Sequence, residues 1–248
     1  GIILGTSGKT EESISRLVHA SKLEPSNCEI YSTISHILRN YIWFTKNLSY
    51  KQEKSIEELI KLEKKKLKLK LSKVPIWFVD IPRTSSTTTQ FHMWNNFGWP
   101  FGKRFKLING NLVQERSLLL PNHTPATIIK YLIGKEMWEE LDSFTIVRNP
   151  YTWCFSLWQL ERNQVPKLRS HSFLQFLNHL NENLQVDLSK RNIRQNTLRQ
   201  TDYLLDEHEN LLVKKILKFE DRDKIKSFLK SQSISFNSDI YINKSKKY

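Results

Sequence analysis

One short stretch of the sequence combines an arginine with a run of hydroxyl side chains, which is chemistry suited to holding an anion. Residues 77–89 read W-F-V-D-I-P-R-T-S-S-T-T-T, so an apolar run of strand length ends at Pro82 and small polar residues follow. Residues 90–97 are compatible with a helix. The start of a helix offers unpaired backbone N–H groups and the positive end of a dipole, and Arg83 adds a full charge and a forked donor. The stretch therefore predicts a strand, a tight turn and a helix start that bind phosphate or sulfate.

A second arginine and a serine are spaced to grip another anionic group. Residues 143–158 read S-F-T-I-V-R-N-P-Y-T-W-C-F-S-L-W. A predicted strand at 144–147 places Arg148 at its end, Asn149-Pro150 begins a helix, and Ser156 lies further along that helix. An arginine at the mouth of a site and a hydroxyl on the adjacent helix are able to hold one phosphate between them.

His123 is the candidate for proton transfer. It precedes Thr124 and Pro125, which predict a helix with Thr124 as its N-cap and Pro125 at its first position. His123 therefore lies on a strand-to-helix turn, which in an open α/β sheet is the edge where ligands collect. A histidine exchanges a proton near neutral pH, so it is suited to act as a general base. His92, in the helix predicted at 90–97, is the rival base, and a structural hydrogen bond is the alternative role for His123.

Hydrophobic patterns along the rest of the chain alternate between strand and helix spacing. Possible strands occupy residues 104–108 and 117–120, and a further strand within 211–219 ends at Glu220. Two later helices are marked by apolar residues at helical spacing: Phe173, Phe176, Leu177, Leu180 and Leu184 in one, and Ile225, Phe228 and Leu229 in the other. The alternation predicts an α/β fold, a parallel sheet with helices on both faces, over residues 74–248. Residues 1–73 predict a helical, basic N-terminal region packed on that domain.

Composition sets outer limits on function. Among 248 residues, 39 Lys and Arg oppose 25 Asp and Glu, and the formal net charge of +14 attracts anions in general: nucleic acid, anionic lipid, acidic polysaccharide or a nucleotide cofactor. The two cysteines are too few for a disulfide framework or a cysteine-based zinc site. The longest apolar runs are far shorter than a membrane span and no signal segment opens the chain, so we expect a soluble protein whose compartment stays open.

Several of these segments, in the same order, resemble one protein family. Pro82-Arg-Thr-Ser-Ser-Thr-Thr is similar to the 5′-phosphosulfate loop, usually P-K-T-G-G-T-S, of sulfotransferases that use 3′-phosphoadenosine 5′-phosphosulfate (PAPS). Residues 148–158 resemble the 3′-phosphate motif of that family, R-[DN]-P-x-x-R-x-x-S-x-[YW], with the same spacing from arginine to serine. His123-Thr-Pro-Ala is similar to an H-[TA]-x-A segment of bacterial and carbohydrate-type members. The C-terminal Q-x-D-Y-L, R-F-E and N-K-S blocks resemble residues 199–206, 216–220 and 242–245, so the resemblance spans residues 75–248.

The resemblance implies a P-loop-like sulfotransferase fold and a reaction that moves a sulfuryl group from PAPS to an acceptor hydroxyl, with a carbohydrate acceptor favoured. The product of the donor is then 3′,5′-ADP, and no metal is required. It implies that the 5′-phosphosulfate is held by Arg83, Thr84, Ser85, Ser86, Thr87 and Thr88, and the 3′-phosphate by Arg148 and Ser156. It also implies catalytic roles for His123, as general base, and for Arg83, and contacts to acceptor or donor for Arg199, Gln200 and Tyr203.

Three positions depart from the pattern of that family. Arg83 stands where lysine is usual, and because arginine stays charged it stabilises the leaving oxygen electrostatically and gives it no proton. Ser85 and Ser86 replace Gly-Gly, so we expect a loop that does not use positive φ angles freely and holds the donor somewhat differently. Trp153 replaces an arginine, which removes one basic contact.

Two other functions stay open on the sequence. A nucleotide-dependent phosphoryl-transfer enzyme needs a magnesium ion held by carboxylates and a regular phosphate loop, neither of which is evident. A basic protein that binds nucleic acid or another polyanion on a P-loop-like scaffold would bind less tightly as salt rises. The resemblance favours a small-molecule or glycan acceptor, including an anionic polysaccharide, over a specific nucleic acid as the partner.

Overall fold

The computed structural model describes residues 76–97, 103–108, 111–116, 123–133, 135–164, 169–185, 199–206 and 208–235, together with residues 16, 19, 20 and 23. The predicted N-terminal region 1–73 lies outside the described residues apart from those four. The predicted strand 117–120 and the C-terminal block 242–245 also lie outside them. Among the helices of the described part, none is both long and apolar enough to cross a membrane.

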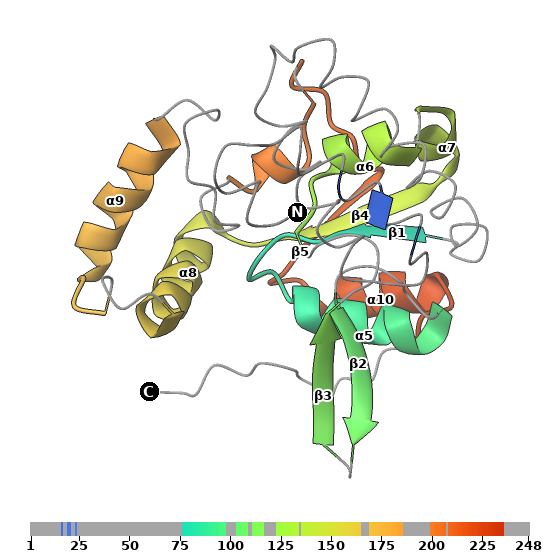
Figure 1. Ribbon diagram of the computed structural model, residues 1–248, viewed down its shortest axis with the longest axis horizontal. Coiled ribbons are helices and arrows are strands. Elements are labelled where there is room, and N and C mark those ends of the chain that lie inside the picture. Colours follow the sequence, from blue (N-terminus) through green and yellow to red (C-terminus); the bar gives the residue numbers. More distant parts are fainter. Residues whose placement is uncertain are drawn as a thin grey trace.

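A parallel three-stranded sheet forms the centre of the described fold (Figure 1). Its strands are β1 (Ile76–Val79), β4 (Asp142–Val147) and β5 (Lys215–Lys218), in the spatial order β1-β4-β5. The predicted α/β class and the parallel direction of these strands are confirmed. Because the strands run in the same direction, the segments that follow them emerge at the same edge of the sheet.

The paired strands β1 and β4 are largely buried, and this burial explains why their sequences are mostly apolar. All four side chains of β1 are buried, which matches its unbroken apolar run, as expected of a parallel strand covered on both faces. The buried polar residues of β4 are satisfied by backbone groups: Thr145 Oγ1 donates to the carbonyl of Val79 at 2.8 Å, and Ser143 Oγ accepts from the amide of Lys214 at 3.1 Å. In β5 only Leu217 is buried, so this strand is the more exposed one.

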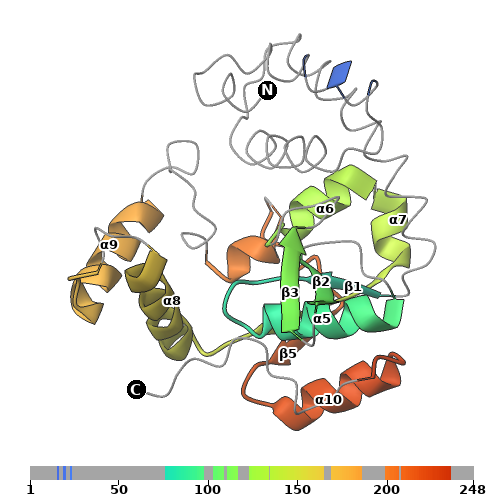
Figure 2. The same cartoon turned by 60° about the horizontal axis from the view of Figure 1, so that its bottom comes forward.

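Helices cover both faces of the sheet (Figures 1 and 2). On one side lie α6 (Ala126–Ile133) and α7 (Lys135–Glu140), and on the other lie α5 (Ser86–Phe97) and α10 (Arg222–Ser231). The helices predicted at 90–97, after residue 124 and around 225–229 are thus confirmed, as is the prediction of helices on both faces.

Aromatic rings attach α10 to the sheet, and one indole hydrogen bond attaches α7 to the segment that precedes β5. The ring of Phe144 lies 5.0 Å from that of Phe78 in β1 and 5.1 Å from that of Phe228 in α10. On the other face, Trp138 of α7 donates from Nε1 to the carbonyl of Leu212 at 3.0 Å. Phe144 is fully buried, so it is the aromatic centre of this layer.

The strands β2 (Lys103–Ile108) and β3 (Asn111–Arg116) form a separate antiparallel pair. The strand predicted at 104–108 is confirmed. The alternation of strands and helices along the chain predicted a parallel sheet, and that prediction was wrong for this strand, which pairs only with β3 among the described strands. The residues between the two strands are Asn109-Gly110, and Asn-Gly is the sequence typical of a two-residue hairpin turn. That signal distinguishes a hairpin from a strand of the main sheet.

A pair of helices lies beside the sheet: α8 (Pro150–Gln164) and α9 (Phe173–Gln185) (Figure 1). They pack through a buried cluster that comprises Trp153, Leu157, Phe176 and Leu180. Asn149 caps α8, because its side-chain oxygen accepts from the amide of Tyr151 at 3.0 Å and its carbonyl accepts from the amide of Trp153 at 2.9 Å. Both helices were predicted at these positions, and a short 3₁₀ helix, η3 (Thr201–Tyr203), follows them.

Two helix starts differ from the sequence prediction. Helix α5 begins at Ser86 instead of residue 90, so the hydroxyl residues Ser86, Thr87 and Thr88 form its first turn. Helix α6 begins at Ala126, and the carbonyl of Pro125 accepts from the amide of Ile129 at 3.2 Å. Pro125 therefore takes the N-cap place that was predicted for Thr124.

Replacing Phe144 tests this account of the core. Phe144→Ala should lower the free energy of unfolding by about 3–5 kcal/mol, because it removes a ring that β1 and α10 both contact and leaves a cavity. Leu174→Ala, on the exposed side of α9, should change the free energy by less than about 0.5 kcal/mol. Urea unfolding followed by circular dichroism measures both values, and equal losses would contradict the central place given to Phe144.

Candidate functional site

The loop between β1 and α5, residues 80–85, has a strained backbone. Arg83 and Ser85 adopt φ angles of 64° and 72°, in the left-handed region that non-glycine residues avoid. Two hydrogen bonds hold this shape: buried Thr84 donates from Oγ1 to the carbonyl of Ile81 at 2.9 Å, and the amide of Thr89 donates to the carbonyl of Ser85 at 3.0 Å. The expectation that a loop without glycine would not use positive φ angles was therefore wrong for Ser85.

The structure brings together three of the residues predicted to bind phosphate. Arg83 Nε donates to Ser156 Oγ at 2.8 Å, which joins the loop to α8. Arg148, at the end of β4, donates from Nη1 to the carbonyl of Arg83 at 3.3 Å. The three residues, from three separate segments, form what we call the arginine cluster: Arg83, Arg148 and Ser156.

The arginine cluster carries two positive charges, and neither forms an ion pair within the described residues. Burial lowers the pKa of the Arg83 guanidinium. Burial also lowers the pKa of Arg148, the positive charge of Arg83 lowers it further, and Glu220 acts in the opposite direction. Arginine nevertheless stays protonated at neutral pH. Within the part of the chain that the structure describes, neither guanidinium forms an ion pair with a carboxylate, so the pair attracts an anion.

Gln200 and Phe219 fix the position of Arg148. The Gln200 side chain accepts from the amide of Arg148 at 2.9 Å and donates to its carbonyl at 2.8 Å, as a neighbouring strand would. The guanidinium lies over the Phe219 ring, 4.7 Å from its centroid, and Nε donates to Thr152 Oγ1 at 3.2 Å. The Gln200 side chain thus supports Arg148 by bonding to the Arg148 backbone. The contact of Gln200 with acceptor or donor stays a prediction.

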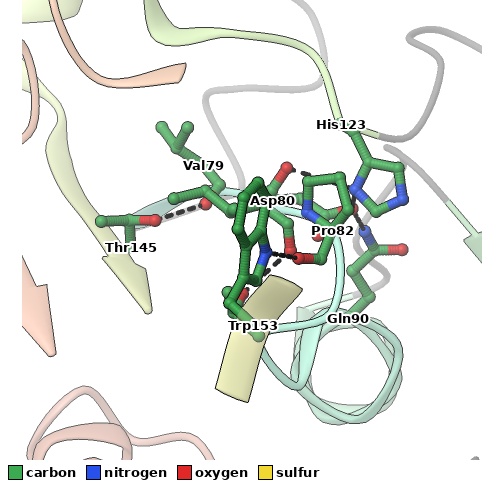
Figure 3. A network of polar contacts seen from close by, with 9 residues as sticks. Val79, Asp80, Pro82, Gln90, His123, Thr145 and Trp153 are labelled. Atoms are coloured by element: carbon green, nitrogen blue, oxygen red, sulfur yellow. Dashed lines mark hydrogen bonds and ion pairs between the residues drawn. The ribbon is translucent and has the colours of Figure 1, made fainter. Parts of the chain in front are cut away.

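Trp153 and Glu220 support the same region. Trp153, which replaces an arginine of the resembling motif, is buried and donates from Nε1 to the carbonyl of Pro82 at 2.8 Å (Figure 3). It fastens α8 to the loop that carries Arg83. Glu220 accepts from the amide of Asn149 at 2.9 Å, so it orients the start of α8.

His123 lies beside a carboxylate that the sequence reasoning missed. Its Nδ1 is 3.0 Å from Asp80 Oδ2 and 3.3 Å from the carbonyl oxygen of Asp80, and its φ angle is 62°. Asp80 also accepts a hydrogen bond from Gln90 Nε2, and Figure 3 shows His123 and Gln90 on the same side of it. A signal was present in the sequence, because Asp80 directly follows the buried run of β1 at the carboxyl end of a parallel strand.

The remaining predicted residues are placed as follows. Thr84 and Tyr203 are fully buried, so their side chains pack within the fold. The amide of Arg199 donates to Asp202 at 2.7 Å, and Arg199 itself is exposed. His92 is only 3% exposed, and burial lowers its pKa while a hydrogen bond to the backbone of Ser235 raises it. A base must reach its substrate, so His92 is the poorer candidate beside His123.

These observations define an α/β protein with a parallel sheet and, at the carboxyl ends of β1 and β4, a site that joins a basic cluster to a histidine–carboxylate pair. No family model, curated protein or solved structure significantly matches the chain. The fold class and the site geometry therefore provide the basis for a functional proposal.

Relief of the strain at Ser85 is testable. Ser85→Gly should raise the free energy of unfolding by roughly 0.5–1 kcal/mol, because the left-handed penalty of about 1–2 kcal/mol exceeds the entropic cost of glycine. The same change in a helix, Ser227→Gly in α10, should lower it by about 0.5 kcal/mol. Opposite signs in urea unfolding support the strained loop, and a destabilising Ser85→Gly would refute it.

Proposed function

We propose that this protein is a PAPS-dependent sulfotransferase that moves a sulfuryl group to an acceptor hydroxyl, with a carbohydrate as the favoured acceptor. The observation that carries the proposal is the arginine cluster, in which two half-buried guanidiniums share one region with no carboxylate partner among the described residues. Burying such charges is costly unless an anion compensates them, so the cluster has the properties of an anion site.

In this proposal, two separate anionic groups of PAPS occupy the two ends of this site. The loop 80–85 and the first turn of α5 would hold the 5′-phosphosulfate, with Arg83 and the hydroxyls of Ser85 and Ser86 as donors. Arg148 and Ser156 would hold the 3′-phosphate, the group that distinguishes PAPS from ordinary nucleotides. The contact between Arg83 and Ser156 joins these two ends, which supports one ligand over two unrelated anions. The order of strand, loop and helix in β1 to α5 supports a P-loop-like sulfotransferase fold.

The chemistry needs placement, charge stabilisation and one base. As the acceptor oxygen forms its bond to sulfur, the bond from sulfur to the phosphate oxygen breaks, and negative charge collects on that oxygen. Arg83 stabilises this charge by its field and hydrogen bonds, since it keeps its own protons. His123 takes the proton of the acceptor hydroxyl. The transfer as proposed requires no metal ion.

Donor binding is the first test. Calorimetric titration with 3′,5′-ADP should show binding, and 5′-AMP should bind more weakly because it lacks the 3′-phosphate. Arg148→Ala should weaken 3′,5′-ADP binding about 10- to 100-fold, the loss of a charged hydrogen bond, and should remove most of the preference over 5′-AMP.

Arg162→Ala is the matched control. Arg162 is an exposed arginine of α8 that contacts Trp158 and the carbonyl of Arg169, so its loss should leave binding unchanged. If the unmodified protein did not bind 3′,5′-ADP, the sulfotransferase proposal would be contradicted. Binding that falls steeply with salt and is indifferent to Arg148→Ala would favour a general polyanion-binding protein instead.

Turnover is the second test. His123→Ala should keep the affinity for 3′,5′-ADP and lower the rate of sulfate transfer by about 10²- to 10⁴-fold, the usual contribution of a general base. Transfer of labelled sulfate from PAPS to a panel of unsulfated oligosaccharides measures the rate. If the variant transferred sulfate at the normal rate, His123 would not be the base.

A further inference from the structure

Asp80 is a buried carboxylate on which two side chains converge. It directly follows β1, and its Oδ2 atom lies 3.0 Å from Nδ1 of His123 and accepts from Nε2 of Gln90 in α5 (Figure 3). The side chain of Asp80 is 9% exposed and that of His123 is 13% exposed. Nothing in the arginine cluster requires this carboxylate, so its position calls for its own explanation.

The surroundings of His123 determine which ring nitrogen carries the proton. Nδ1 faces two oxygens of Asp80, the carboxylate Oδ2 at 3.0 Å and the backbone carbonyl at 3.3 Å. A carbonyl oxygen only accepts hydrogen bonds, and so does an ionised carboxylate. Nδ1 must therefore be the donor, which leaves Nε2 of the neutral ring with a lone pair.

Gln90 holds the carboxylate in the orientation that His123 needs. The amide nitrogen of Gln90 faces Oδ2, because its amide oxygen would be repelled there, so Oδ2 serves as acceptor for both neighbours. The other carboxylate oxygen, Oδ1, is buried and has no hydrogen-bond partner within the described structure. The two contacts at Oδ2 are thus what orients Asp80.

We propose that Asp80 is a positioning residue that keeps His123 in its Nδ1–H tautomer and directs Nε2 toward the acceptor hydroxyl. The tautomer follows from the geometry, whereas its use in catalysis rests on the proposed sulfotransferase function. In the reaction, the hydroxyl proton moves to Nε2 as the new oxygen–sulfur bond forms, and the carboxylate stabilises the resulting imidazolium. The backbone of His123 is strained, with φ at 62°, and such strain is typical of residues whose side chains are held in place at functional sites.

Asp80→Asn distinguishes a positioning role from a packing role. Asparagine has nearly the same size as aspartate, but its side chain has one acceptor oxygen in place of two and carries no charge. If that oxygen faces His123 and Gln90, the N–H₂ group is buried where Oδ1 lies, with no acceptor observed there. If the amide is turned, its N–H₂ group faces Nδ1, which must then accept, and the ring proton moves to Nε2. In either arrangement the negative charge is lost.

The experiment reads the tautomer directly. Long-range ¹H–¹⁵N correlation spectra of the full chain, with the His123 signals assigned by their loss in His123→Gln, should show a protonated Nδ1 and a bare Nε2. In Asp80→Asn the Nε2–H form should become populated, and kcat should fall at least about 100-fold, the scale of a lost general base, with the Kd for 3′,5′-ADP unchanged. Asp142→Asn, at an exposed aspartate that pairs with Lys214, is the control and should alter neither.

Two results would overturn the inference. One is an Nε2–H tautomer of His123 in the unmodified protein, and this measurement does not depend on whether any variant folds. The other is an Asp80→Asn protein with normal kcat. Failure of 3′,5′-ADP to bind would instead count against the sulfotransferase proposal and leave the tautomer result standing, so the two failures are distinguishable.

Discussion

The structure around the site depends on keeping two positive charges close together in a partly buried place. Arg83 and Arg148 repel each other, and burial raises the cost of their charges, as their lowered pKa values indicate. Contacts other than ion pairs offset part of this cost: the hydroxyl of Ser156, the aromatic face of Phe219 and the backbone bonds from Gln200. Each of these contacts comes from a different segment, so the cluster forms only when the strands, α8 and the 3₁₀ region are assembled.

Backbone strain is concentrated in the same place. Among the described non-glycine residues, five have positive φ angles, and three of these are Arg83, Ser85 and His123. Such conformations persist only where surrounding contacts fix them, and they are typical of functional sites. Here the hydrogen bond from Trp153 to Pro82 and the one from Thr84 to Ile81 supply that support.

Much of this arrangement could be predicted from the sequence, because local patterns determine it. The buried run of β1, the Pro-initiated helix α8 and the spacing that brings Arg148 and Ser156 to one region are all visible along the chain. What could not be predicted are contacts between distant segments, such as Asp80 with His123 or Trp153 with Pro82, since periodicity carries no information on pairing across the fold. The β2–β3 hairpin is different, because its Asn-Gly signal was local and was overlooked.

The loop without glycine has a consequence for how the protein responds to heat. Its shape is held by a hydrogen bond within the loop, from Thr84 to Ile81, and by one from another segment, from Trp153 to Pro82, while Arg83 and Ser85 bear the cost of positive φ angles. Warming that loosens the contacts of α8 with this loop should let Arg83 and Ser85 relax toward ordinary backbone angles. The proposed anion site would then be lost at a temperature where much of the secondary structure is still intact.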